Sequence, residues 1–255
     1  MNSNIQIIRY EECESSLWKN GGGSTKQLLI SPKDADLSNF DFRISIATIS
    51  SDGPFSQFPS IDRQLCILEG AGVKLKMMSN DAAEANELIL RPNEPAFCFS
   101  GETQIESQLL DKQIIDFNVM TKRGKYRAYI ERPELYGSLS PESSETSYIN
   151  DAHQTSNVHN NELQQWLLCL EPLNLVYQGQ IIQLKRYDMV QCLRGQDLKA
   201  QPSKMKRLDE IETSDATSSD AELPILKHSH IENPSLLNHK QCQVLRIVIE
   251  CTKKF

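Results

Sequence analysis

The sequence repeats a block of residues whose pattern is typical of β-structure, and this repeat limits the folds available to it. Residues 90–101 align without gaps with residues 184–195, with Leu, Cys and Gly identical at three positions. An apolar segment containing Cys precedes each block, and a segment rich in Ile and Val follows each. These flanking segments are residues 66–69 and 113–119 in the first copy and residues 168–171 and 243–249 in the second. The preserved order predicts two similar units in one chain.

Five segments alternate apolar and polar residues with the period of two that a half-buried strand requires. They are residues 40–49, 64–76, 113–120, 166–177 and 243–251. A sustained helical period is scarce, and the best helix candidate, residues 81–87, is short. The pattern therefore predicts a mainly β fold of two small sandwiches or barrels, packed together so that exposed edges and apolar faces are buried.

Two polar stretches interrupt the pattern. Residues 138–162 are poor in large apolar side chains and are expected to form a linker. The distance from Gly101 to Gln113 in the first copy is 12 positions, and that from Gly195 to Gln243 in the second is 48. The second copy is therefore longer by 36 positions. This excess contains six acidic residues between Asp209 and Glu222 and no base between them. We interpret it as a solvated loop inserted into the second unit.

Charge and hydropathy exclude several classes of partner. The net charge of −7, without a block of Lys and Arg, argues against binding of nucleic acid. No apolar run approaches the length of about 20 residues that crosses a bilayer, and the first residues lack a secretory pattern. The seven cysteines are scattered without a Cys-x-x-Cys pair, which indicates reduced thiols. We therefore expect a soluble, cytoplasmic protein that binds neither nucleic acid nor membranes.

Three consecutive glycines make residues 18–25 the most unusual segment. Glycines are kept where the chain turns through positive φ or where another group approaches the backbone closely. The bare amides of Gly21 and Gly22, beside Trp18 and Asn20, would suit an anion. A tight turn into the following strand explains the same composition. The spacing of a phosphate-binding loop is absent.

Polar residues occupy one face of two predicted strands. Arg43 and Ser45 share a face opposite a row of Phe and Ile side chains, and Asp116 and Asn118 share a face of a later strand. In the second copy the positions aligned with Asp116 and Asn118 carry Arg246 and Val248. A polar site, if the face is buried, is therefore expected in the first unit.

Four motifs in order carry a resemblance to a known family. They are residues 18–25 (WKNGGGST), 42–47 (FRISIA), 53–63 (GPFSQFPSIDR) and 116–121 (DFNVMT). The chain resembles the HutD/Ves family, whose motifs cover about the first 130 residues. The resemblance implies a bicupin, two cupin-type β-barrels in one chain, and a link to histidine utilisation through binding of a small pathway molecule. Many relatives have Trp where this chain has Phe42, and the acidic insertion lengthens the second unit.

These observations give a division of the chain into parts. We expect a first barrel with the ligand pocket at residues 1–137, a polar linker at residues 138–162, and a second barrel at residues 163–255. The acidic insertion of the second barrel is expected at about residues 202–235. The sequence leaves open whether the protein is a monomer or a homodimer.

The first hypothesis for function is a binding protein for a small carboxylate, without metal or cofactor. Arg43 would hold the carboxylate through its planar fork, and Trp18 with Phe55 would cover the rest of the ligand. Ligands that fit this inventory and the implied pathway are urocanate and an N-formyl or N-formimino glutamate. The remaining ligand-binding candidates are Asn20, Gly21, Gly22, Ser45, Ser56, Asp116 and Asn118.

Three alternatives remain. A metal-free cupin enzyme could use Asp116 or Asp62 as acid or base, with Arg43 or Arg63 stabilising an anion. No histidine lies in the first unit, which argues against proton shuttling by imidazole and against a His-based metal site there. An interaction module could use the acidic loop. A metal site could use two histidines and a glutamate of the second unit, namely His228, His230 and Glu232.

Overall fold

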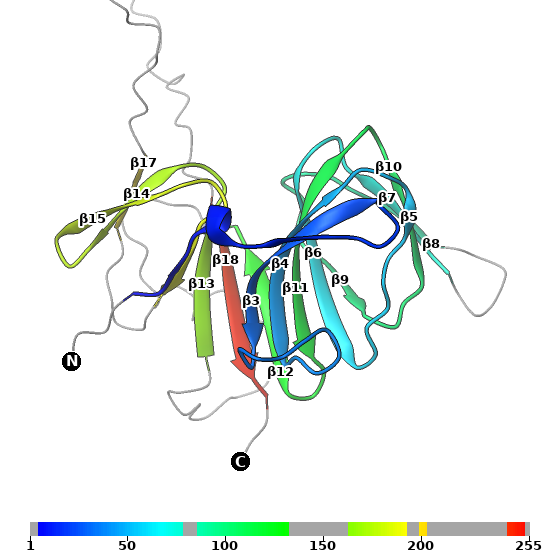
Figure 1. The fold of residues 1–255 in the computed structure, drawn as a ribbon, viewed down its shortest axis with the longest axis horizontal. Coiled ribbons are helices and arrows are strands. Elements are labelled where there is room, and N and C mark those ends of the chain that lie inside the picture. The colour runs from blue at the N-terminus through cyan, green and yellow to red at the C-terminus, as the bar shows by residue number, and fades with distance from the viewer. Residues whose placement is uncertain (1–4, 79–85, 133–162, 193–198, 203–243, 253–255) are drawn as a thin grey trace, which may run out of the picture.

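The structure is a computed structural model that describes residues 5–78, 86–132, 163–192, 199–202 and 244–252 (Figure 1). Strands make up most of these residues, and the single described helical turn is the 3-10 segment η1 (Tyr10–Glu12). The predicted mainly β class is confirmed. No helix among these residues has the length and apolar character needed to cross a membrane.

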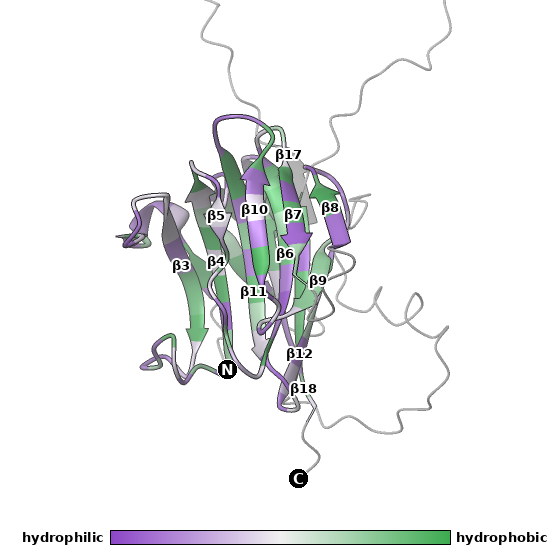
Figure 2. Cartoon of the chain, turned by 90° about the vertical axis from the view of Figure 1, so that its right-hand side faces the viewer, coloured by the Kyte–Doolittle hydropathy of each residue, from purple (hydrophilic) through white to green (hydrophobic). Residues whose placement is uncertain are grey.

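Two sheets are built mostly from the first half of the chain. The six-stranded sheet has the order β2-β3-β4-β11-β6-β9, and the four-stranded sheet has the order β5-β10-β7-β8. The strands of the larger sheet are β2 (Ser15–Leu17), β3 (Gly23–Ser31), β4 (Phe42–Ile49), β6 (Ile61–Glu69), β9 (Phe97–Ser100) and β11 (Ile114–Lys122). Those of the smaller sheet are β5 (Gly53–Pro54), β7 (Val73–Met77), β8 (Asn86–Leu90) and β10 (Ile105–Leu109). Hydrophobic and hydrophilic residues alternate along β7 and β10 (Figure 2), as a half-buried strand requires.

Two further sheets contain the second half. The five-stranded sheet has the order β1-β16-β13-β18-β12, and the three-stranded sheet has the order β15-β14-β17. The strands of the five-stranded sheet are β1 (Ile7–Ile8), β12 (Tyr126–Glu131), β13 (Leu163–Cys169), β16 (Met189–Cys192) and β18 (Val244–Cys251). Those of the three-stranded sheet are β14 (Leu173–Tyr177), β15 (Gln180–Leu184) and β17 (Lys199–Pro202).

The repeat in the sequence corresponds to a repeat in strand order. In the first large sheet β6 lies between β11 and β9, and in the second β13 lies between β18 and β16. In the small sheets β7 pairs with β8 and β10, as β14 pairs with β15 and β17. β12 occupies beside β18 the place that β4 occupies beside β11, so this strand of the first half completes the sheet of the second.

Some predicted elements differ in their bounds. The predicted strand 64–76 is two strands, because the chain turns at Gly70 and Gly72 with φ of 95° and 112°. The predicted strand 166–177 is likewise interrupted between β13 and β14. The helix expected at residues 81–87 is wrong at its end, because Glu87 pairs within β8. Residues 81–85, the linker and most of the acidic insertion lie outside the described residues.

The two large sheets pack against each other through apolar faces. β4 contributes Phe42, Ile44 and Ile46, which meet Trp166 and Leu168 of β13 in one buried cluster. A second cluster fills the space between the six- and four-stranded sheets and includes Leu65, Ile67, Val73, Leu75, Ile105 and Ile114. Each of these aliphatic side chains stabilises the fold by about 1.5–3 kcal/mol relative to exposure. The six-stranded sheet is therefore covered on both faces.

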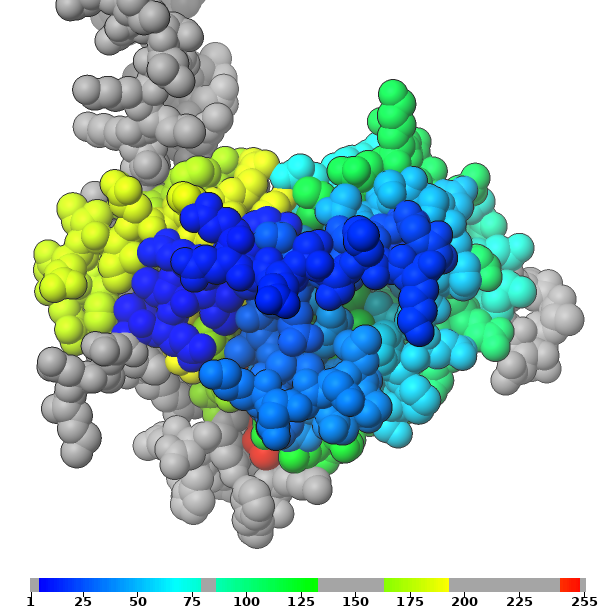
Figure 3. All heavy atoms as spheres, viewed as in Figure 1, coloured from blue at the N-terminus to red at the C-terminus, as the bar shows by residue number. Residues whose placement is uncertain are grey.

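The N-terminal segment joins the two halves. β1 lies at the edge of the five-stranded sheet, η1 follows, and β2 lies at the edge of the six-stranded sheet. Figure 3 shows this segment in dark blue, crossing one face of the molecule from the second half to the first. Asp188, which is 1% exposed, accepts hydrogen bonds from Arg9 Nη1 at 2.7 Å and from the Tyr10 backbone N–H at 3.0 Å. This buried carboxylate anchors the crossing.

Candidate functional site

A row of buried polar side chains lies on the inner face of the six-stranded sheet, the face toward the four-stranded sheet. β4 supplies Arg43 and Ser45, β6 supplies Arg63, and β11 supplies Asp116 and Asn118. All five are less than 10% exposed. Burial of three ionisable groups is costly unless they interact with one another or with a ligand. This row is therefore the strongest candidate for a functional site among the described residues.

Strand register brings the five residues together. In the antiparallel pair of β4 and β11, Ser45 lies opposite Asn118 and Arg43 lies opposite Met120. On the other side of β11, Arg63 of β6 also lies opposite Met120. Residues directly opposite in adjacent strands point to the same face. The two arginines thus flank β11 at one level, and Asn118 and Asp116 follow at the next levels along it.

Arg43 is held on two sides by neutral side chains. Its Nε donates a hydrogen bond to Gln27 Oε1 at 2.9 Å, and its Nη1 donates to Ser45 Oγ at 3.3 Å. Burial lowers its pKa, and the nearby Asp116 carboxylate opposes that shift. Neither bonded partner carries a charge. The guanidinium therefore retains the capacity to pair with an anion.

Arg63 is enclosed by aromatic rings. Its guanidinium carbon lies 4.8 Å from the centre of the Phe99 ring and 5.6 Å from those of Phe55 and Phe58. Its Nη1 donates a hydrogen bond to the Ser56 carbonyl oxygen at 3.0 Å, but its buried Nε has no partner among the described residues. Burial lowers its pKa to about 10, still high enough to keep the cation at neutral pH.

Asp116 is the buried carboxylate of the row and interacts electrostatically with both cations. Burial raises its pKa to about 7, against the lowering effects of Arg63, a hydrogen bond from the Ala47 backbone and Arg43. Its Oδ1 has no hydrogen-bond partner among the described residues, and neither has Oδ1 of Asn118. Buried polar atoms are normally satisfied, and an exception indicates a water, an ion or a ligand. The site therefore offers two cations, two unused acceptors and a group that titrates near neutrality.

The structure places Trp18 and Phe55 at the edge of the apolar cluster beside this row. The Trp18 Nε1 donates to Thr25 Oγ1 at 2.8 Å. Asn20 Oδ1 accepts a hydrogen bond from the Gly22 backbone N–H at 3.1 Å, and Gly21 has φ of 71°. The glycine-rich segment is thus a turn closed by its own asparagine, and Asn20 and Gly21 are exposed.

Ser56 and Asp62 lie apart from the row. The Ser56 residue is exposed and only its carbonyl meets Arg63. Asp62 is adjacent to Arg63 in β6 and points to the opposite face, where its Oδ1 accepts from Arg123 Nε at 2.7 Å. The structure does not bring Asp62 together with Arg43 or Asp116, because successive residues of a strand alternate between faces.

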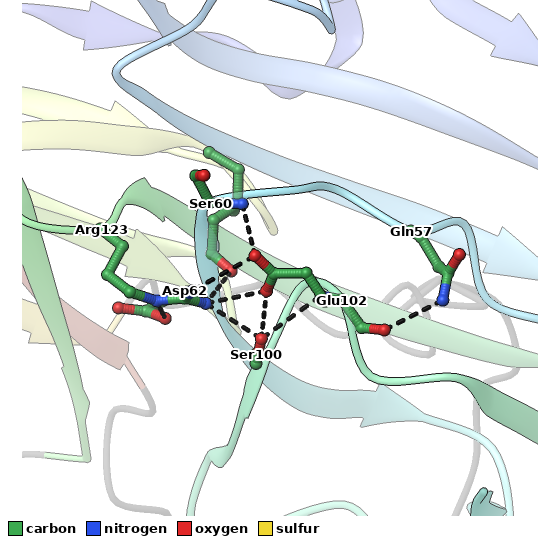
Figure 4. Close-up of polar contacts among 7 residues, drawn as sticks. Gln57, Ser60, Asp62, Ser100, Glu102 and Arg123 are labelled. Atoms are coloured by element: carbon green, nitrogen blue, oxygen red, sulfur yellow. Dashed lines mark hydrogen bonds and ion pairs between the residues drawn. The ribbon is translucent and has the colours of Figure 1, made fainter. Parts of the chain in front are cut away.

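Arg123 and Glu102 fasten the loop that follows Phe55 (Figure 4). Glu102 Oε1 accepts from the Ser60 backbone N–H at 2.6 Å, and Gln57 Nε2 donates to the Glu102 carbonyl oxygen at 2.9 Å. The Arg123 guanidinium holds the pKa of the Glu102 carboxyl well below its usual range. This surface network fixes the loop whose Phe55 and Phe58 rings enclose Arg63.

Three site residues escaped the sequence-based prediction: Gln27, Phe58 and Phe99. Phe99 contacts Arg63 because β9 pairs with β6 at this position. Gln27 reaches Arg43 beside an irregularity in the pairing of β3 with β4. The aromatic richness of the Phe55 and Phe99 segments is a signal in the sequence, but their common target is set by long-range pairing.

A cavity of about 350 Å³ lies beside β6 and β9. Asp62, Gln64, Cys98 and Arg127 line it, together with Arg63 and Phe99. Of its three charged groups, Asp62 pairs with Arg123 and Arg127 pairs with Glu250, whereas Arg63 belongs to the buried row and keeps its Nε without a partner in the described part of the chain. The Gln64 amide donates to the Ala128 carbonyl oxygen. The cavity therefore offers less unmet polar capacity than the buried row.

The described residues contain no cluster of three or more His, Cys, Asp or Glu arranged to hold a metal. All five histidines lie outside those residues, so the site suggested at His228, His230 and Glu232 stays a prediction.

Comparison with known proteins shows which family the chain belongs to. The HutD family model matches residues 10–208, more than half of the chain. The chain belongs to the HutD family. It is 34% identical over 144 residues to an uncharacterized 21.2 kDa protein in the hutC 3' region of Pseudomonas putida, covering 54% of this chain and 71% of that protein. It is 34% identical over 127 residues to protein Ves of Cronobacter sakazakii, covering 49% of this chain and 65% of Ves.

Solved structures agree on the fold. HutD from Pseudomonas fluorescens, determined in a formate condition, superposes with a TM-score of 0.60 at 19% identity, covering 97% of this chain and 99% of that one. A variant of oxalate decarboxylase from Bacillus subtilis gives a TM-score of 0.51 at 6% identity, covering 100% of this chain and 79% of that one. At these identities the likeness concerns the fold alone, which is mainly β and cupin-like.

Proposed function

We propose that this HutD family member binds a small carboxylate-bearing molecule, without a metal, in the buried polar row of the first half. The observation that carries the proposal is the unmet hydrogen-bonding capacity of Arg63, Asp116 and Asn118 in a site that water scarcely reaches. A carboxylate beside the two guanidinium groups would offset their positive charge, and its oxygens would accept hydrogen bonds from the N–H groups that have no partner among the described residues. Asn118 would orient the ligand through its amide.

The remaining predicted residues have supporting roles in this proposal. Phe55 lies against Arg63 and borders the apolar cluster that also includes Trp18, so the two rings would cover the apolar part of the ligand. Ser45 keeps Arg43 in place. The turn at Asn20, Gly21 and Gly22 would shape the wall that carries Trp18.

The pathway assignment rests on the family. A HutD protein and a protein of the hutC region are among the relatives, and the resemblance implies a connection with histidine utilisation. We propose urocanate or an N-formyl or N-formimino glutamate as ligand, and a modulatory role in that pathway, in the cytoplasm. Each of these ligands carries at least one carboxylate for the arginines.

We further propose that the chain is a bicupin. Two units with the same strand order would each close as a small barrel, the first at residues 1–137 and the second at residues 163–255 after the linker at 138–162. The pairing of β12 with β18 would place the end of the first segment within the second barrel. The acidic insertion at about residues 202–235 would lie outside both barrels.

Calorimetry on the purified full chain tests the binding proposal. Titration with urocanate and with N-formyl-L-glutamate is expected to give saturable heat for the wild type and none for Arg63→Met. Arg127→Met is the matched control, because Arg127 lies on β12 in the five-stranded sheet and pairs with Glu250. Absence of heat and of a thermal shift with every candidate at millimolar concentration would reject the proposal.

A second candidate function is favoured by one observation. Asp116 has a pKa of about 7 beside two cations, which suits a general acid or base. NMR spectroscopy of each candidate ligand, incubated with the protein for hours, would reveal turnover. Conversion that disappears in Asp116→Asn and persists in Asp62→Asn would establish an enzyme, whereas unchanged spectra would leave binding as the function.

A further inference from the structure

The buried polar row contains more charge of one sign than its own groups neutralise. Arg43 and Arg63 carry two positive charges, and Asp116 carries at most one negative charge. If a ligand carboxylate enters beside the arginines, it also approaches Asp116, and two carboxylates in one buried site repel each other strongly. A proton taken up by one of the two carboxylates removes this repulsion.

Geometry decides which of them takes it up. The ligand carboxylate would have two guanidinium groups as donors, and each hydrogen bond to the charged form favours ionisation. Asp116 Oδ1 has no donor among the described residues. The proton therefore belongs on Asp116, and an O–H at this oxygen would be a donor that faces the ligand.

We propose that this site binds its carboxylate ligand together with one proton, which Asp116 holds as a neutral acid that donates a hydrogen bond to the ligand. The inference rests on the proposed function and adds to it the ligand's chemistry: a carboxylate with a neutral acceptor, such as a carbonyl oxygen, close to it. Asp116 becomes the residue that determines specificity for that acceptor. A pKa near 7 in the free protein makes this uptake measurable at neutral pH.

The groups around Asp116 support this assignment. From β4 it faces Arg43 and the Ala47 backbone, and from β6 it faces Arg63. Cys66 of β6 lies near it, but burial raises the thiol pKa to about 11, so the thiol stays neutral in the range of interest. The opposing four-stranded sheet contributes Val73, Leu75 and Ile105 to the apolar cluster that contains Ala47 and Ile67, the two residues paired with Asp116. Among these described side chains, Asp116 alone changes charge between about pH 6 and 9.

The linkage has a definite sign. Binding favours protonated Asp116, so its pKa is higher in the complex than in the free protein. Below about pH 7 the acid is already protonated, and affinity is independent of pH. Above that value the dissociation constant rises about tenfold per pH unit, because each binding event must take up one proton.

Calorimetry in buffers of different ionisation enthalpy measures this uptake. The probe is N-formyl-L-glutamate, whose two carboxyl groups stay ionised above about pH 6. The wild type is expected to take up about one proton per ligand near pH 8.5 and almost none near pH 6. Asp116→Asn is expected to bind without proton uptake and with similar affinity across this range. Asp62→Asn, a carboxylate on the other face of β6, is the matched control and should behave as the wild type does.

The outcomes separate the two proposals. Binding of the probe by wild type without proton uptake overturns this inference alone and leaves the proposed function intact. The same holds if Asp116→Asn keeps the pH dependence of the wild type, since a histidine elsewhere would then be the titrating group. No binding of any candidate ligand at any pH overturns the proposed function, and this inference with it.

Discussion

The buried charged side chains on the inner faces of the two halves differ in how completely they are paired. In the first half, Arg63 and Asp116 each retain a buried polar atom without a partner. In the second half, Arg246 on β18 pairs with Glu131 on β12, with Arg246 Nε 2.7 Å from Glu131 Oε2, and the two side chains are 13% and 19% exposed. The same strand order thus supports an open polar site in one half and a closed ion pair in the other. Of these two sites, the one in the first half keeps charged groups with unused hydrogen-bonding atoms.

The comparison also explains why the first half can tolerate its buried charges. The desolvation cost of Asp116 is reduced because its pKa of about 7 allows the carboxyl to be neutral. Arg63 is surrounded by three aromatic rings that attract a cation. Glu131 and Arg246 instead satisfy each other. Substitutions in the two halves should therefore differ in sign as well as in size.

The largest effect is expected on ligand binding. Arg43→Met removes a buried cation of the open site and should weaken binding of N-formyl-L-glutamate by about 100- to 1,000-fold, or roughly 3–4 kcal/mol. Arg127→Met in the five-stranded sheet should leave the dissociation constant within about twofold. Calorimetry measures both. Equal losses in the two variants would remove the distinction between the halves.

Next in size is the closed ion pair. Glu131→Gln leaves the Arg246 guanidinium mostly buried without its counter-charge and should lower the free energy of unfolding by about 2–4 kcal/mol. Urea denaturation followed by fluorescence provides the measurement. A loss below about 0.5 kcal/mol would mean that solvent screens the pair.

Asp116→Asn should change the free energy of unfolding in the opposite direction, stabilising the protein above neutral pH. The folded pKa of Asp116, about 7, lies above its unfolded value of about 3.9, so its contribution to stability is complete below pH 4 and is lost as pH rises through 7. The variant should match the wild type near pH 4 and exceed it by about 1–3 kcal/mol near pH 8. Denaturation at both pH values tests this. A variant less stable than the wild type at pH 8 would show that the ionised carboxylate is satisfied.

The smallest effect is expected at Asp62. Its carboxylate is about half exposed and pairs with Arg123 on the face away from the buried row. Asp62→Asn should change the free energy of unfolding by less than about 0.5 kcal/mol and leave ligand affinity within about twofold. A larger loss of affinity would show that the surface network in Figure 4 controls the loop around Arg63.

Much of the fold and of the candidate site could be predicted from the sequence. A period of two places Arg43 with Ser45 and Asp116 with Asn118, whichever partners the strands have. The repeat predicted matching strand order, and absence of a repeated Asp at the position of Arg246 predicted that the polar site belongs to one half. The HutD motifs predicted the family, which the family match confirms.

Other features depend on contacts between distant segments. The contact of Phe99 with Arg63 follows from the pairing of β9 with β6, and that of Gln27 with Arg43 follows from an irregular pairing of β3 with β4. The turn within residues 64–76 and the transfer of β12 to the second sheet were also missed, because strand patterns do not identify partners.

The sequence by itself determined which side chains share a face, because alternation is a local property of an extended backbone. It also determined the family and the repeated order of strands. Only the tertiary structure decided that the polar face of β4, β6 and β11 is buried, that Asp62 faces away from it, and that Asp116 titrates near neutrality. These properties depend on desolvation and on charges from three strands, and strand pairing sets both over distances that the local pattern does not encode.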